Sequence, residues 1–150
     1  MKLAEALQIR ADLQRRIAQM PQRLAGNAKV QEGSRPAEEP SLLLEELRQM
    51  IARLEEITVR INLANSRMID YTTTMTALLA RREALRRHID IVRGLLSAAS
   101  DLAPRHTLTE IRVVSTIDVA ARRKECDDMS KQLHELEIRI QSLNWTIDLD

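Results

Sequence analysis

Three histidines are the residues that could most readily bind a metal, because helical proteins often hold two iron ions through Glu-x-x-His sequences. In that motif a glutamate three positions before the histidine shares its helix face, so both side chains reach the metal. The histidines here are His88, His106 and His134, and the residues three positions before them are Leu85, Ala103 and Lys131. None of these supplies the carboxylate, so the sequence predicts no metal ligands.

Cys126 is the single cysteine of the chain and the one thiol that could act as a nucleophile. A catalytic thiol needs a base within reach, but His134 lies about 12 Å further along a helix axis. Cys126 instead falls on an apolar stripe and is interpreted as a buried structural thiol. Motifs of serine nucleophiles, phosphate loops and dinucleotide-binding folds are missing from the sequence. We therefore predict no catalytic residue and no cofactor. Enzymatic activity remains an alternative only through an active site shared between subunits.

Arginines are concentrated in the segment 76–115, which has seven basic and four acidic residues, whereas 116–150 has five basic and eight acidic residues. Arg82, Arg86 and Arg93 are candidates for a polyanion or nucleic-acid patch. Such a patch usually includes aromatic side chains that stack on bases, and only 1% of the residues are aromatic. The favoured interpretation is that these arginines pair with the acidic segment, and nucleic-acid binding is the alternative.

The composition is that of a soluble helical protein. Hydrophobic residues make up 44% of the 150 residues and charged residues 30%, with 23 Lys and Arg against 22 Asp and Glu. The scarcity of glycine, proline and aromatic residues disfavours an all-β fold. The N-terminus lacks the apolar stretch of a signal peptide, and no apolar run approaches the roughly 20 residues of a membrane span. We expect one domain over residues 1–150, in the cytoplasm and without a membrane partner.

Apolar residues recur every three or four positions in four segments, which predicts four long helices. The first is expected over residues 2–25, and Pro21, which lacks a backbone donor, should kink it or end it near Met20. The second is expected from residue 40 or 41 to about residue 65, because a proline at position 40 suits the start of a helix.

The third helix is expected over residues 77–103, with Thr76 as its N-cap. The fourth is expected to begin at Ser115 or Thr116 and has the most regular apolar repeat in the chain. This repeat consists of Val119, Cys126, Met129, Leu133, Leu136, Ile140, Leu143 and Ile147. A repeat sustained over about four heptads is typical of a coiled-coil seam.

Helices of this length favour a mainly α fold class, an elongated up-down-up-down bundle. Antiparallel neighbours would place the joints 26–39 and 104–115 at the same end of that bundle. Both joints contain short β-favouring runs, residues 28–31 and 110–114, which we expect to pair as a small β ribbon. Mobile loops are the alternative.

The expected ribbon also predicts an assembly contact. Val30, Ile111 and Val113 would turn toward the helix ends, and a neighbouring subunit would cover the open edges of the ribbon. An oligomer is also favoured by apolar residues that lie outside the helix stripes and would be poorly covered in a single chain. They include Leu42, Leu63, Leu79, Leu95 and Ile138. The sequence therefore predicts a homo-oligomer and not a monomer.

Several stretches of the sequence resemble one family of uncharacterised bacterial proteins. The stretches are MKLAEALQIRADLQRRI, NAKVQEGSRPAEEP, LARREALR, EIRVVSTIDVAARRK and IQSLNWTIDL. Together they extend in order over nearly the whole chain, and they resemble the septicolysin or septicolysin-like family. The resemblance implies a mainly helical fold with a small β element, a homo-oligomer such as a hexamer, and a bacterial cytoplasmic setting.

The family label suggests a cytolysin, but the residues favour other functions. A pore-forming protein needs lipid-facing strands or an apolar helix, and the sequence predicts neither. The favoured function is a self-assembling helical protein that acts as a structural or interaction module. A polyanion binder is the alternative, and a cytolysin is the least favoured.

Overall fold

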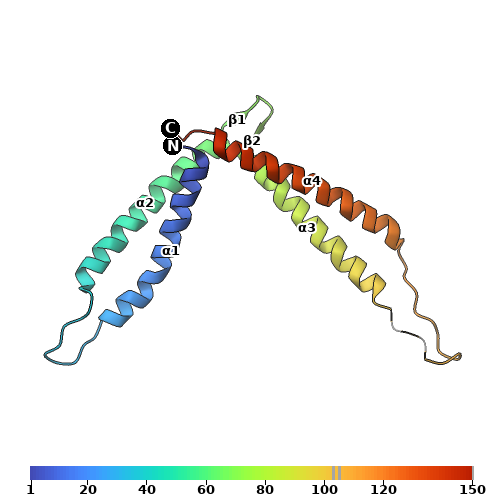
Figure 1. Ribbon diagram of the computed structural model, residues 1–150, viewed down its shortest axis with the longest axis horizontal. Coiled ribbons are helices and arrows are strands. Elements are labelled where there is room, and N and C mark those ends of the chain that lie inside the picture. Colours follow the sequence, from blue (N-terminus) through green and yellow to red (C-terminus); the bar gives the residue numbers. More distant parts are fainter. Residues whose placement is uncertain (103, 105, 150) are drawn as a thin grey trace. The chain divides into compact units, whose positions relative to one another are not determined.

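The computed structural model of the chain describes residues 1–102, 104 and 106–149. Its helices are α1 (Leu3–Asn27), α2 (Pro40–Ser66), α3 (Met75–Ser100) and α4 (Val119–Thr146), as Figure 1 shows. A small two-stranded antiparallel sheet, β1 (Met68–Ile69) and β2 (Thr73–Thr74), lies between α2 and α3. The expected mainly α fold with a small β element is confirmed, and the pairing of the helices is consistent with a bundle.

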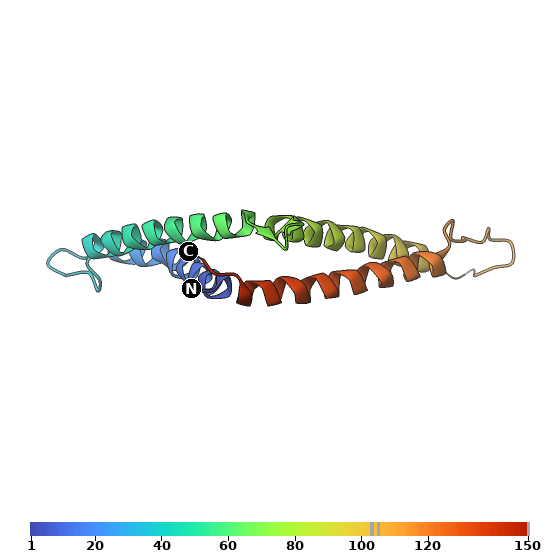
Figure 2. The same cartoon turned by 90° about the horizontal axis from the view of Figure 1, so that it is seen from above.

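The chain divides into two compact units. The first comprises Met1–Met68 and the C-terminal residues from Leu143, and the second comprises Ile69–Ser142. In each unit two helices lie side by side and antiparallel, α1 with α2 and α3 with α4, in both views (Figures 1 and 2). Each unit is therefore built on a helical hairpin.

The first unit is held together by apolar side chains between α1 and α2. The buried residues on these helices include Leu13, Met20, Leu43, Met50 and Ile57. Helix α1 continues through Pro21 to Asn27, so the proline does not end it near Met20. A proline inside a helix removes one backbone hydrogen bond, and the packing of Met20, which is fully buried, outweighs that loss.

The two ends of the chain are joined within the first unit. The amide of Leu3 donates to the carbonyl of Ile147 at 2.9 Å, and the amide of Leu149 donates to the carbonyl of Met1 at 2.8 Å. Between these bonds, the Lys2 ammonium lies 2.8 Å from the Asp148 carboxylate. Figure 1 shows the termini side by side, and the backbone of residues 2 and 148 forms an isolated antiparallel bridge.

The second unit has a core between α3 and α4. Its buried members are Ile89, Val92, Cys126 and Met129, and the partly buried Leu85, Leu96 and Leu133 pack against them. Cys126, Met129 and Leu133 belong to the apolar repeat expected for the fourth helix. The sequence pattern thus identified the face through which α4 packs against α3.

Two helix starts differ from the sequence expectation. Helix α3 begins at Met75 because Thr74, not Thr76, is its N-cap, with its hydroxyl accepting from the amide of Ala77 at 3.1 Å. Helix α4 begins at Val119, not at Ser115 or Thr116, because the carboxylate of Asp118 accepts from the amide of Ala121 at 3.0 Å. Each difference follows from which side chain satisfies the free amides of the first turn.

The expected ribbon between residues 28–31 and 110–114 is wrong, because neither run is a strand. The first joint is bonded locally: the amide of Glu38 donates to the side chain of Asn27 at 2.9 Å. The second joint is also bonded locally, since the Glu110 carboxylate accepts from the amide of His106 at 2.7 Å. Both runs therefore lie in loops whose polar groups find partners nearby.

The strands that form are those next to a tight turn at residues 69–72. The amide of Thr72 donates to the carbonyl of Ile69 at 3.1 Å. Asp70 and Tyr71 both have positive φ, 50° and 58°, which is the geometry of a type I′ hairpin turn. This hairpin is not expected from the sequence, because tyrosine rarely adopts positive φ.

Candidate functional site

The arginines proposed as a polyanion patch are largely engaged by α4. Arg86 pairs with Glu137, with 2.5 Å between Nη2 and Oε1, and Arg93 Nη2 lies 3.4 Å from the hydroxyl of Ser130. The Nε of Arg82 is buried and has no hydrogen-bond partner in the described part of the chain. The expected pairing with the acidic segment is therefore observed for Arg86, and polyanion binding stays a prediction.

The residues proposed as oligomer contacts are exposed. Ile111 has 94% of its surface in contact with solvent, Val113 61% and Val30 49%. Ile111 and Val113 lie in the loop between α3 and α4, next to the exposed Leu108 and Val114, and Val30 lies in the loop between α1 and α2. Their side chains are not covered by helix ends as expected, so they are available to another molecule.

Cys126 and the three histidines differ in their exposure to solvent. Cys126 is 5% exposed within the core between α3 and α4, which confirms its interpretation as a buried thiol. His88, His106 and His134 are exposed. Among the described residues, no three histidine, cysteine or acidic side chains lie close enough together to hold a metal ion.

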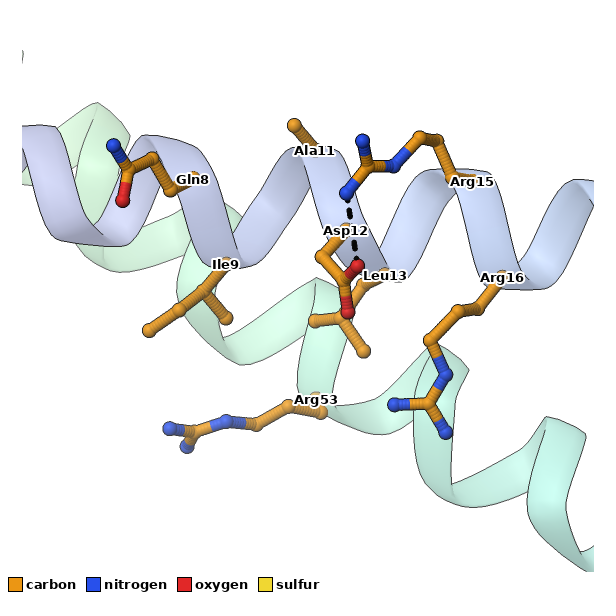
Figure 3. A pocket seen from close by; sticks show the side chains of 8 residues that line it. All are labelled: Gln8, Ile9, Ala11, Asp12, Leu13, Arg15, Arg16 and Arg53. Carbon is orange, nitrogen blue, oxygen red and sulfur yellow. Dashed lines mark hydrogen bonds and ion pairs between the residues drawn. The ribbon is translucent and has the colours of Figure 1, made fainter.

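A pocket of about 600 Å³ lies beside α1 and α2 and has three arginines in its wall (Figure 3). Ile9 and Leu13 form its apolar part, and the arginines are Arg15, Arg16 and Arg53. Each guanidinium already has a carboxylate partner: Asp12 for Arg15, Glu46 for Arg16 and Glu56 for Arg53, at 3.0, 3.4 and 2.7 Å. The pocket is therefore an internally neutralised groove and not a ready anion site. No sequence motif marks it, because its residues come from two helices.

A polar cluster joins the end of α1 to the start of α2. Arg23 donates to both carboxylate oxygens of Glu38, and its Nη2 also lies 3.3 Å from Glu46. The hydrogen bond from Arg23 lowers the pKa of Glu38 below its usual value. Desolvation of the carboxylate opposes this shift, and the positive charge of Arg23 adds to it. The same bond raises the pKa of Arg23. This geometry ties the loop that precedes α2 to the end of α1.

A second pocket, of about 560 Å³, lies on the side of α3 that faces away from the core. It is lined by Ala80, Glu83, Ala84, Arg87, His88 and Ile91. The wall is mostly apolar, because two alanines leave a hollow beside the large side chain of Ile91. No sequence motif marks this surface, because its apolar part consists mainly of alanines.

None of the described helices has an apolar stretch sufficient to cross a lipid bilayer.

The comparisons with known proteins concern the whole chain. The model of a family of unknown function (DUF6847) matches residues 10–149. Among solved structures, the chain is similar to a functionally unknown conserved protein from Corynebacterium diphtheriae, with 36% sequence identity and a TM-score of 0.88. That similarity covers 100% of this chain and 99% of the other. No curated protein matches the sequence.

Proposed function

The chain belongs to the family of unknown function DUF6847. We propose that it is a self-assembling helical protein that acts as a structural or interaction module. The proposal depends on exposed apolar side chains, and above all on Ile111. A fully buried isoleucine contributes about 1.5–3 kcal/mol relative to an exposed one. A side chain that is 94% exposed contributes almost nothing to the folded single chain.

The loop that carries Ile111 is apolar along much of its length. Leu108, Val113 and Val114 are also exposed, and they lie within six residues of one another along the chain with Ile111 between them. Contiguous exposed apolar residues on a folded protein usually mark an interface. In this proposal Ile111 and Val113, together with Val30 of the other loop, contact a second copy.

The native mass of the protein tests self-assembly. Sedimentation of the wild-type chain at micromolar concentration should show species larger than the 17.2 kDa single chain. The same measurement tests the hexamer that the septicolysin resemblance implies. A single species of about 17 kDa would overturn the proposed function.

A pair of matched variants tests the role of the loop. Ile111→Lys should shift the population toward smaller species with unchanged helix content, because it puts a charge where an apolar contact is needed. Thr109→Lys is the control, since it adds the same charge at an exposed neighbouring position. Equal masses for both variants and the wild type would exclude Ile111 from the interface while leaving self-assembly intact.

A further inference from the structure

The C-terminal tail, residues 147–149, docks on the N-terminal end of α1. Two backbone hydrogen bonds flank the pair of Lys2 and Asp148, and the charged groups of that pair lie 2.8 Å apart. Leu149 in the tail and Leu3 in the first turn of α1 are both buried. The tail is therefore part of the first unit, although Lys2 and Asp148 are 146 positions apart in the chain.

The chain passes through the second unit before the tail returns to the first. It leaves the first unit after Met68, forms the second unit over Ile69–Ser142 and returns at Leu143. The return lies inside α4, which is one continuous helix, whereas the exit lies in the hairpin of β1 and β2. The hairpin is therefore the connection that can open without breaking a helix.

This hairpin is strained and weakly held. Asp70 and Tyr71 have φ of 50° and 58°, a conformation that residues with a Cβ rarely adopt. Each strand has only two residues, and a two-stranded ribbon is marginally stable in water. The contact between Asp70 and Arg139 is long, at 4.0 Å, and it is exposed. Opening the turn therefore relieves strain and loses few contacts.

An opened hairpin is long enough to reach another molecule. The eight residues 67–74 between α2 and α3 span roughly 26 Å when fully extended. A helix with its side chains is about 10 Å wide, so this segment can cross to a neighbouring copy. The tail of each copy then finds on the other copy the same docking site that it occupies in the single chain. Reciprocal exchange fills both sites and gives a closed two-fold dimer.

We infer that two copies of this chain exchange their second units, so that residues 147–149 of each copy dock on residues 1–3 of the other. The turn at residues 69–72 is the hinge. Short strained hinges favour this form of dimer, because the docking contacts are kept and the strain of the turn is lost. The inference rests on the proposed self-assembly and names one of its contacts, on a different segment from the loop contact at Ile111.

Two single-cysteine variants test whether the tail docks on a second copy. Lys2→Cys and Asp148→Cys, each in a Cys126→Ala background, are unfolded together, refolded and oxidised. Positions 2 and 148 are directly paired across the bridge, and such pairs have Cα atoms about 4.5–5.5 Å apart, within the range of a disulfide. We expect a covalent dimer with one chain of each variant. Each variant oxidised alone is the control and should stay a single chain on a denaturing gel.

The outcomes of this test separate the exchange from self-assembly. A native assembly larger than one chain that gives no mixed covalent dimer would overturn the exchange and leave self-assembly intact. A wild-type chain that is monomeric at every concentration would overturn both. The docking hydrogen bonds join backbone groups, so neither substitution removes them, and circular dichroism of the refolded mixture measures whether both variants fold.

A relaxed turn tests the hinge in a chain whose docking residues are unchanged. Asp70→Asn with Tyr71→Gly gives the turn the residue pair that adopts this conformation most readily. Because the closed chain is then unstrained, the dissociation constant of the dimer should rise tenfold or more in sedimentation over a concentration series. Thr109→Gly, at an exposed loop position without positive φ, should leave that constant unchanged. Equal dissociation constants for the turn variant and the wild type would overturn the turn as the hinge.

Discussion

Arg23 near the end of α1 and Glu38 before the start of α2 are joined by two parallel hydrogen bonds, Nε to Oε2 at 3.2 Å and Nη2 to Oε1 at 2.5 Å. The backbone amide of Glu38 also donates to Asn27, whose side-chain amide donates to the carbonyl of Arg23 at 2.9 Å. A two-pronged arginine–carboxylate pair has a fixed geometry. This cluster therefore determines where the loop of residues 28–37 leaves α1 and returns to α2.

Replacing Glu38 should make the free energy of unfolding less dependent on pH in the acidic range. Because Arg23 lowers the folded-state pKa of Glu38, the carboxylate contributes stability above its unfolded pKa and loses it as the pH falls through the folded value. Glu38→Gln should therefore lower the melting temperature at pH 7, and the difference from wild type should shrink toward pH 3. Thermal unfolding monitored by circular dichroism over this range measures it. Glu32→Gln, at an exposed position of the same loop, should show no such convergence.

The contact between Lys2 and Asp148 should control the exchange of the amides at the chain ends. The hydrogen bond from Lys2 lowers the pKa of Asp148, and the charges of Lys2 and the N-terminus add to the effect. Asp148→Asn should speed hydrogen exchange of the Leu3 and Leu149 amides at neutral pH, and the wild type should approach the variant below the folded pKa of Asp148. Asp127→Asn on α4 is a control. Equal exchange in wild type and Asp148→Asn at neutral pH would show that the backbone bonds alone hold the ends.

The helices were predictable from the sequence because their signal is local. A repeat of three and four residues reports the buried face of a helix whatever it packs against, so α2 was expected over 40–65 and forms over Pro40–Ser66. The expected ribbon between residues 28–31 and 110–114 had no such local signal, and it does not form. It required two distant joints to meet, whereas the residues of each joint bond to groups close to them in the chain.

The candidate surfaces were predictable only in part. Leu95 was identified as an apolar residue outside the main stripe, but the hollow beside Ala80 and Ala84 depends on how these small residues are placed next to Ile91. The pairing of Arg86 with the acidic fourth helix followed from the opposite charges of the two segments. Its partner, Glu137, could be named only once the two helices were aligned.

Cys126 should behave as part of the core. Cys126→Ala removes a buried sulfur from between α3 and α4, and we expect a loss of about 1–2 kcal/mol in the free energy of unfolding. Urea denaturation measures this change, and Ser97→Ala at an exposed position of α3 should stay within about 0.5 kcal/mol of wild type. In the native protein the thiol should react slowly with a thiol reagent. Rapid reaction without unfolding would contradict the burial of Cys126.

Tyr71→Gly should stabilise the protein, although it removes the largest side chain of the turn. Tyr71 has φ of 58°, a conformation that costs a side-chain-bearing residue roughly 1–2 kcal/mol and glycine nothing. Its side chain is 97% exposed, so few contacts are lost. After the added flexibility of glycine in the unfolded chain, we expect a gain of about 0.5–1 kcal/mol in urea denaturation. Thr72→Gly, next in the chain and without positive φ, should instead destabilise. A loss of stability in Tyr71→Gly would show that the tyrosine ring makes a contact in the assembled protein that the single chain lacks.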